Sequence, residues 1–133
     1  MKKIIIDTNA LMAIEELHID LFGELEKSID FPHELYVLQG TINELNDIVK
    51  SERWKFRQAA NVALRLLKAK KISIIEEEMP LKMNRGKEID VDDLLVEHSR
   101  KGDIILTQDI LLKKRLQKPF LTIRQRKMVI LVE

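Results

Sequence analysis

The hydrophobic pattern is strongest at the beginning of the chain. Residues 4–6 are three consecutive isoleucines between polar residues, which predicts a short strand buried on both faces in the middle of a parallel sheet. Such a strand places the next residue, Asp7, in the crevice at the carboxyl ends of the strands, where open α/β sheets have their functional sites. Asp7 or Thr8 would also serve as the N-cap of a helix beginning near Ala10, so a structural role and a chemical role are both open for this carboxylate.

Strand and helix patterns alternate along the rest of the chain. Helices are predicted at 10–17 and 19–27, after Thr41, and at 54–70, 94–100 and 110–116; strands are predicted at 35–38, 72–75, 103–106 and 121–123, with a further strand at 128–132. Residues 76–88 are predicted to form a charged loop. This alternation predicts a single α/β domain over residues 1–133, with a parallel sheet covered by helices on both faces.

Two local patterns give sharper predictions. Glu44 follows Thr41 at the spacing of a capping box, which offers a purely structural role for Glu44. In the predicted helix 54–70, one apolar face is expected to enter the core, and it consists of Phe56, Ala60, Ala63 and Leu67.

Composition narrows the chemistry. The chain has no cysteine and three histidines, which excludes disulfides, thiol nucleophiles and cysteine-ligated metal sites. Any metal would therefore be a hard cation held by oxygen ligands. The apolar run at 4–6 is too short for a signal peptide, and no other stretch is predicted to span a membrane, so we expect a cytoplasmic protein without a membrane partner.

Acidic residues follow the predicted strands in a recurring way. Asp7 and Asp109 each come after a predicted buried strand, Glu44 lies one turn into a helix, and Asp92 and Asp93 precede the helix at 94–100. If they meet at one end of the sheet, their mutual repulsion requires a compensating cation. Carboxylate ligands favour Mg²⁺ or Mn²⁺, and a divalent ion held in this way suits phosphoryl chemistry.

Four short blocks together resemble those of PIN-domain ribonucleases. They are Ile-Ile-Asp-Thr-Asn at 5–9, Thr-Ile-Asn-Glu-Leu at 41–45, Asp-Asp-Leu-Leu-Val at 92–96 and Thr-Gln-Asp at 107–109. Their order and approximate spacing agree with the family. The segments 107–116 and 121–127 most resemble the archaeal branch close to the PIN proteins that process ribosomal RNA, and resemble VapC-type toxins less.

The resemblance implies a site, a fold and a set of partners. Catalytic and metal-binding carboxylates would be Asp7, Glu44, Asp93 and Asp109, with Asp92 as the alternative to Asp93 and with Asn9 and Thr107 as polar support. Asp93 is preferred because Val96 then takes the apolar position that the family pattern expects. The implied fold is a three-layer α/β/α domain with a five-stranded parallel sheet in the order 3-2-1-4-5. The implied activity is Mg²⁺- or Mn²⁺-dependent cleavage of single-stranded or loop RNA. Homodimers, pre-rRNA or ribosomal particles, and an antitoxin in the VapC case, are the implied partners.

Positive charge is concentrated late in the chain. From residue 99 onward, nine basic side chains stand against three acidic ones. We expect a group of these to bind the phosphate backbone of RNA: Lys113, Lys114, Arg115, Arg124, Arg126 and Lys127. Trp54 and Tyr36 are candidates for base stacking, although packing is the more common role of a single tryptophan.

Other protein classes share some features of this pattern. A haloacid-dehalogenase phosphatase would need an aspartate at position 9, where this chain has asparagine, and a receiver domain would need a phosphoacceptor after its third strand. A PIN domain that binds RNA without cleaving it remains the non-enzymatic alternative. For the enzyme, we expect in-line attack by metal-activated water, which leaves a 3′-hydroxyl and a 5′-phosphate.

Overall fold

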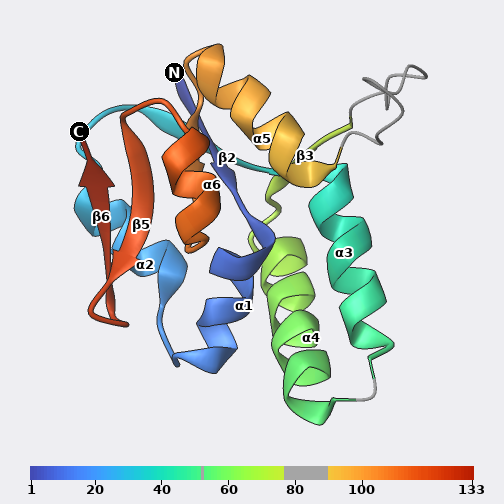
Figure 1. The fold of residues 1–133 in the computed structure, drawn as a ribbon. Coiled ribbons are helices and arrows are strands. Elements are labelled where there is room, and N and C mark those ends of the chain that lie inside the picture. The colour runs from blue at the N-terminus through green and yellow to red at the C-terminus, as the bar shows by residue number, and fades with distance from the viewer. Residues whose placement is uncertain (52, 77–89) are drawn as a thin grey trace.

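A computed structural model describes residues 1–51, 53–76 and 90–133, and within these ranges one sheet is flanked by helices on both faces (Figure 1). The strands are β1 (Lys2–Ile6), β2 (His33–Leu38), β3 (Ser73–Ile75), β4 (Ile104–Leu106), β5 (Phe120–Arg124) and β6 (Met128–Val132). The helices are α1 (Thr8–Glu16), α2 (Leu21–Ser28), α3 (Gln39–Val49), α4 (Trp54–Ala69), α5 (Val91–Arg100) and α6 (Ile110–Arg115). The predicted charged loop at 76–88 lies, from residue 77 onward, outside the described residues.

The order of the sheet is β3-β2-β1-β4-β5-β6, with β1 in its interior. Ile5 of β1 is paired with Tyr36 of β2 on one side and with Ile105 of β4 on the other, both in parallel register. The predicted order 3-2-1-4-5 is confirmed. The sixth strand, β6, adds an antiparallel edge by pairing with β5 across a tight turn.

The isoleucines of β1 alternate between two hydrophobic cores. Ile4 and Ile6 pack with α1, α2 and α4 on one face of the sheet, whereas Ile5 packs with α5 and α6 on the other face. All three side chains have 0% exposure, and burial of each stabilises the fold by roughly 1.5–3 kcal/mol. The result is the expected three-layer α/β/α arrangement. Among the described residues, no helix is long and apolar enough to cross a membrane.

The predicted capping box at Thr41 is wrong. Strand β2 runs directly into α3, whose N-cap is Leu38, so Thr41 lies inside the helix and is fully buried. The glycine at position 40 allows the start of α5 to approach the first turn of α3 closely: a Cβ atom at this position would lie 2.6 Å from Cγ2 of Val91. Glu44 therefore has no capping role toward Thr41.

The predicted core face of α4 is correct except at its first turn. Ala60, Ala63 and Leu67 are buried, but Phe56 is 40% exposed. Helical periodicity identifies which residues share a face, but it does not indicate how far along the helix the core extends. Phe56 lies beyond that limit.

Candidate active site

A cavity of about 480 Å³ lies where α1, α3, α5 and α6 begin or pass the carboxyl edge of the sheet. Five carboxylates line it, and four of them come from four separate segments of the chain: Asp7, Glu44, Asp92 and Asp109. The structure thus brings together the carboxylates that follow β1 and β4 with one from α3 and one from α5. The remaining lining residues are Thr8, Asn9, Met12, Glu16, Ile48, Ser51 and Phe56.

Helix N-termini place three of these carboxylates. Asp7 is the N-cap of α1, Asp109 is the N-cap of α6, and Asp92 lies in the first turn of α5. The exposed N–H groups and the dipole at the start of a helix favour negative charge. The predicted N-cap role of Asp7 is confirmed, and the same side chain also lines the cavity.

Asp7 is held rigidly by two short hydrogen bonds. Its Oδ1 accepts from the backbone N–H of Thr8 at 2.7 Å, and its Oδ2 accepts from the hydroxyl of Thr107 at 2.7 Å. The side chain is only 5% exposed. Burial raises the pKa of Asp7, the two hydrogen bonds partly oppose that rise, and the nearby charges of Asp92 and Asp109 add to it.

Asn9 and Thr107 connect the ends of β1 and β4. Asn9 Oδ1 accepts from the backbone N–H of Gln108 at 3.0 Å, and Thr107 Oγ1 accepts from the backbone N–H of Asp109 at 3.1 Å. Asp109 in turn accepts from two backbone N–H groups of α6, at 2.9 and 3.2 Å. Both residues predicted as polar support thus lie in one network with Asp7 and Asp109.

Glu44 and Asp92 experience mutual repulsion across the cavity. Burial of the carboxyl group raises the pKa of Glu44, and the charge of Asp7 raises it further. Burial likewise raises the pKa of Asp92, with further contributions from Asp90 and Asp109. The Thr8 hydroxyl weakly opposes the rise at Glu44, but it has no hydrogen-bond partner of normal geometry among the described residues. The free protein therefore carries unfavourable like-charge interactions at this site.

Asp93 does not line the cavity. It forms a capping box with Asp90 at the start of α5, through hydrogen bonds of 2.9 and 3.3 Å. Its Oδ1 also accepts from Nη2 of Arg115 at 2.7 Å, and this interaction lowers the pKa of Asp93. The family pattern favours Asp93 as the carboxylate of the third block, but the geometry favours Asp92. Arg115, through its ion pair with Asp93, helps to hold the beginning of α5 in place.

The other predicted RNA-binding residues lie at the same end of the sheet. Lys113 is half-buried one turn after Asp109, burial lowers its pKa, and Lys114 beside it is exposed. The turn between β5 and β6 exposes Arg124, Arg126 and Lys127. Because β5 runs parallel to β4, this basic turn lies at the carboxyl edge with the acidic cavity.

The oxygen-rich lining fits a hard divalent cation. Carboxylates repel one another around the cavity, a buried hydroxyl lacks a good partner, and the chain has no cysteine. Within the ranges that the structure describes, no three acidic or histidine side chains form a ready-made ligand cluster. Mg²⁺ does not require one, because it retains several waters and is commonly held by one or two carboxylates.

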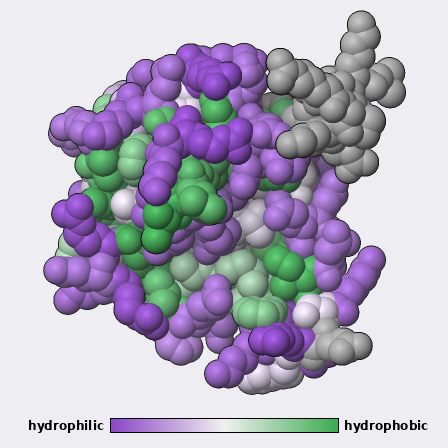
Figure 2. All heavy atoms as spheres, viewed as in Figure 1, coloured by the Kyte–Doolittle hydropathy of each residue, from purple (hydrophilic) through white to green (hydrophobic). Residues whose placement is uncertain are grey.

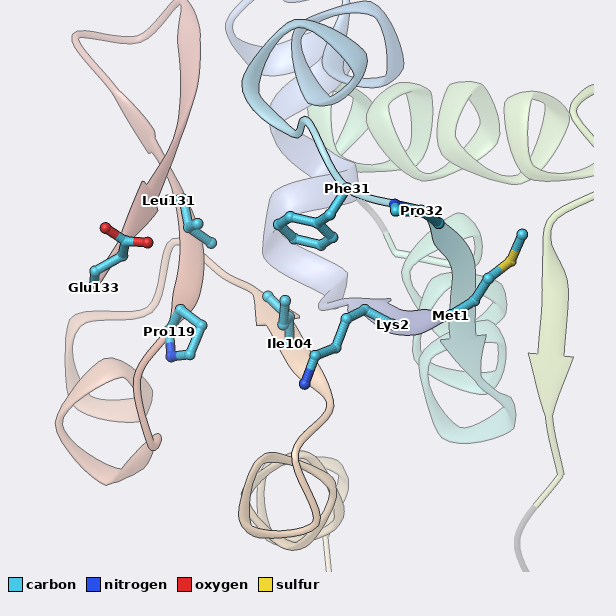
Figure 3. A pocket seen from close by; sticks show the side chains of 8 residues that line it. All are labelled: Met1, Lys2, Phe31, Pro32, Ile104, Pro119, Leu131 and Glu133. Atoms are coloured by element: carbon cyan, nitrogen blue, oxygen red, sulfur yellow. The ribbon is translucent and has the colours of Figure 1, made fainter.

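A second cavity, of about 570 Å³, lies at the opposite end of the sheet (Figure 3). Its lining is mainly apolar, with Phe31, Ile104 and Leu131 around it and the charged residues Lys2 and Glu133 beside them. Although this cavity is larger, it contains a single carboxylate. The cluster of acidic side chains therefore lies at the carboxyl edge of the sheet, in the first cavity.

Sequence reasoning missed the apolar side of the acidic cavity. Met12 and Phe56 line it together with Glu16, yet periodicity placed Phe56 in the core. The signal that could have identified it was position: Phe56 lies in the first turn of α4, where fewer neighbours can cover it.

Comparisons with known proteins agree with this architecture. The profile of the PIN-like domain family matches residues 4–126. Ribonuclease VapC4 of Methanocaldococcus jannaschii is 25% identical over 132 residues, covering 96% of this chain and 94% of that protein.

Solved structures share the fold. The PIN domain endonuclease Utp24 matches with a TM-score of 0.70 at 20% identity, over 97% of this chain and 90% of that chain. VapBC2 of Rickettsia felis, bound to a DNA fragment from its promoter, matches with a TM-score of 0.56 at 18% identity, over 86% of this chain and 92% of that chain.

Proposed function

Because this chain belongs to the PIN-like domain family, we propose that it is a Mg²⁺- or Mn²⁺-dependent endoribonuclease that hydrolyses phosphodiester bonds in single-stranded or loop RNA. The observation that carries the proposal is the convergence of Asp7, Glu44, Asp92 and Asp109 on one cavity. The similarity to a ribonuclease and to a PIN domain endonuclease supports the same reaction class.

The cavity carboxylates would hold the cation. Asp7 offers the most rigid ligand, since Thr8 and Thr107 fix both of its oxygens, and Asp109 and Asp92 complete the negative lining. When bound, a divalent cation supplies Lewis-acid stabilisation of the negative charge that develops on the phosphate oxygens. Glu44 lies at the exposed rim with a raised pKa, and both properties suit a group that takes a proton from water.

Nearby cations would hold the substrate. Lys113 lies one turn beyond Asp109, while Lys114 and the basic turn of Arg124, Arg126 and Lys127 lie at the same edge. These groups would neutralise phosphates on either side of the bond that is cleaved. Arg115 is engaged by Asp93, so we assign it to the positioning of α5 rather than to RNA.

The expected products carry a 3′-hydroxyl and a 5′-phosphate. A metal-free mechanism that uses two histidines as acid and base lacks its residues at this site, because none of the described residues that line the cavity is a histidine. RNA is the proposed substrate, within pre-rRNA or ribosomal particles. A homodimer, and an antitoxin as the resemblance to VapC-type toxins implies, are proposed protein partners.

The test is a cleavage assay on labelled single-stranded RNA with Mg²⁺, Mn²⁺ or EDTA. Asp7→Asn and Asp109→Asn should each reduce the cleavage rate by more than about 100-fold, because the loss of a direct metal ligand lowers activity at least as much as the loss of an outer-shell partner. Asp20→Asn is the matched control, because Asn caps α2 as well as Asp does. Cleavage in EDTA, or 2′,3′-cyclic phosphate ends, would contradict the mechanism. RNA binding without cleavage would instead identify a non-catalytic RNA-binding domain.

A further inference from the structure

A second hollow lies next to the acidic cavity. This hollow, of about 450 Å³, is lined by Glu15, Glu16, His18, Trp54, Lys55, Phe56 and Gln58. Phe56 and Glu16 line both spaces. The two hollows therefore lie next to each other, and we call the second one, from Glu16 and Phe56 to Trp54, the side groove.

The side groove exposes two aromatic rings. Trp54 is 65% exposed and Phe56 is 40% exposed, although both are large side chains that proteins usually bury. Figure 2 shows apolar side chains reaching the surface over α1 and α4, the helices that supply the two walls of the groove. Exposed aromatic faces beside a polar site are typical of ligand contacts.

The two walls differ in charge. On the α4 side, Lys55 lines the groove and the guanidinium of Arg53 lies 5.8 Å from the centre of the Phe56 ring. On the α1 side, the groove is lined by Glu15, which accepts from Gln58 Nε2 at 3.1 Å, and by Glu16. Phosphates would be attracted to the basic wall and repelled by the acidic one.

This asymmetry matches a single strand of RNA. Its backbone can follow Arg53 and Lys55, its bases can stack on Phe56 and Trp54, and its base edges then face the carboxylate of Glu16. Stacking on aromatic side chains accepts any base. Carboxylates, by contrast, accept hydrogen bonds from the exocyclic amino groups that adenine, cytosine and guanine carry and uracil lacks.

We propose that the side groove binds the nucleotides that flank the cleaved bond, by stacking bases on Phe56 and Trp54 and by favouring adenine and cytosine over uracil at Glu16. The proposal rests on the proposed function in that its ligand is RNA. It assigns specificity to Glu16 and the two aromatic rings, none of which belongs to the set Asp7, Glu44, Asp92 and Asp109.

The chain reports on this groove directly, because Trp54 is its only tryptophan. Short single-stranded oligomers of A, C or U would be titrated into the intact protein in EDTA while Trp54 fluorescence is followed. Saturable quenching is expected, with tighter binding of the A and C oligomers. Phe56→Ala should weaken binding ~5- to ~140-fold, the equivalent of losing one stacked base. Glu16→Gln should reduce the difference in affinity between the A or C oligomers and the U oligomer.

Matched variants separate stacking from other effects. Phe56→Leu keeps apolar volume without a π face, so it should lose most of the binding that Phe56→Ala loses. Trp54→Phe should retain affinity when binding is followed by the anisotropy of labelled RNA. Ile74→Ala, at an exposed apolar residue of the sheet edge, should leave affinity unchanged. Unchanged thermal melting of each variant would show that it folds.

The proposal for the side groove and the proposal of nuclease activity can be contradicted independently of each other. Cleavage by the wild type without Trp54 quenching, and with full affinity in Phe56→Ala, would overturn the groove and leave the proposed function in place. Quenching with the expected Phe56 losses but no cleavage in Mg²⁺ or Mn²⁺ would support the groove and contradict the nuclease. If Phe56→Ala instead abolishes self-association seen by sedimentation and leaves RNA affinity intact, the groove is a protein interface and the proposal is wrong.

Discussion

Two adjacent aspartates show how local environment separates chemical roles at the scale of a residue. Asp92 lines the acidic cavity, where burial and the charges of Asp90 and Asp109 raise its pKa. Asp93 points instead to Arg115 and to the backbone of Asp90, which together lower its pKa. One carboxylate therefore costs stability in the free protein, and its neighbour contributes stability.

Substitution of these two residues should shift stability in opposite directions. When folding raises the pKa of a carboxyl group, ionisation of that group destabilises the folded protein. This loss of stability begins as the pH rises above the ordinary pKa, about 4, and is complete above the raised pKa. In EDTA at pH 7, Asp92→Asn should therefore raise the melting temperature, and the difference from wild type should vanish toward pH 4. Asp93→Asn should lower stability at pH 7 by no more than about 1 kcal/mol, as for an exposed ion pair. That loss should also disappear as pH falls through the lowered pKa, because wild-type Asp93 is then protonated.

The measurement is thermal unfolding from about pH 2 to pH 8, repeated with Mn²⁺. Mn²⁺ should stabilise the wild type and Asp93→Asn, and it should stabilise Asp92→Asn less. The reverse assignment, with Asp93 as the ligand, would be indicated if Asp93→Asn alone lost the response to Mn²⁺.

At the scale of an element, the β5–β6 hairpin brings positive charge to the acidic edge. Its turn carries Arg124, Arg126 and Lys127, all exposed, and Gln125 and Arg126 adopt left-handed backbone conformations at φ 55° and 60°. The antiparallel pairing of β6 with β5 holds this turn in place. The hairpin thus extends the sheet and also presents cations beside the cavity.

Removal of these cations should weaken RNA binding in a salt-dependent way. The triple substitution Arg124→Ala, Arg126→Ala and Lys127→Ala should lower affinity for single-stranded RNA in EDTA. It should also reduce the slope of log K against log[salt] by about 0.7 for each phosphate that the variant no longer neutralises. Arg100→Ala with Lys101→Ala is the control, since these residues precede β4 at the opposite end of the sheet. An unchanged slope in the triple variant would exclude the hairpin from the RNA-binding surface.

At the scale of the whole molecule, we expect metal binding to be coupled to folding, because the carboxylates of the site come from four separate segments of the chain. The carboxylates of the cavity come from segments between residues 7 and 109, so only the folded chain brings them together. A cation that binds the folded state alone stabilises it by RT ln(1 + [L]/Kd), about 2.7 kcal/mol at a hundredfold excess over Kd.

The melting temperature should consequently rise by several degrees in millimolar Mn²⁺ or Mg²⁺, with Mn²⁺ the more effective ion. Differential scanning fluorimetry with and without EDTA measures the shift. Asp7→Asn should remove most of it, and Asp20→Asn should retain it. Equal melting temperatures of the wild type with and without both ions would argue against a cation site at this cavity.

Much of the fold is predictable because strand and helix periodicities are local. Three consecutive isoleucines identified the buried strand in the interior of the sheet, and the alternation that follows it predicted a parallel sheet with helices on both faces, whereas the strand order came from the family resemblance. Asp7 and Asp109 were identified for the same reason: a residue that follows a buried strand of a parallel sheet lies at the carboxyl edge.

Only the tertiary structure shows which side chains line the cavity and the side groove. The choice between Asp92 and Asp93 depends on where α5 begins, which Asp90 and the ion pair with Arg115 of α6 determine. Glu44 has no capping role toward Thr41 because α3 begins at Gln39, directly after β2, which places Thr41 inside the helix. Phe56 became a wall of the side groove because α4 extends beyond the core that its periodicity predicted. The ion pair between Asp93 and Arg115 joins segments that are distant in sequence, and the local pattern of the chain carries no information about it.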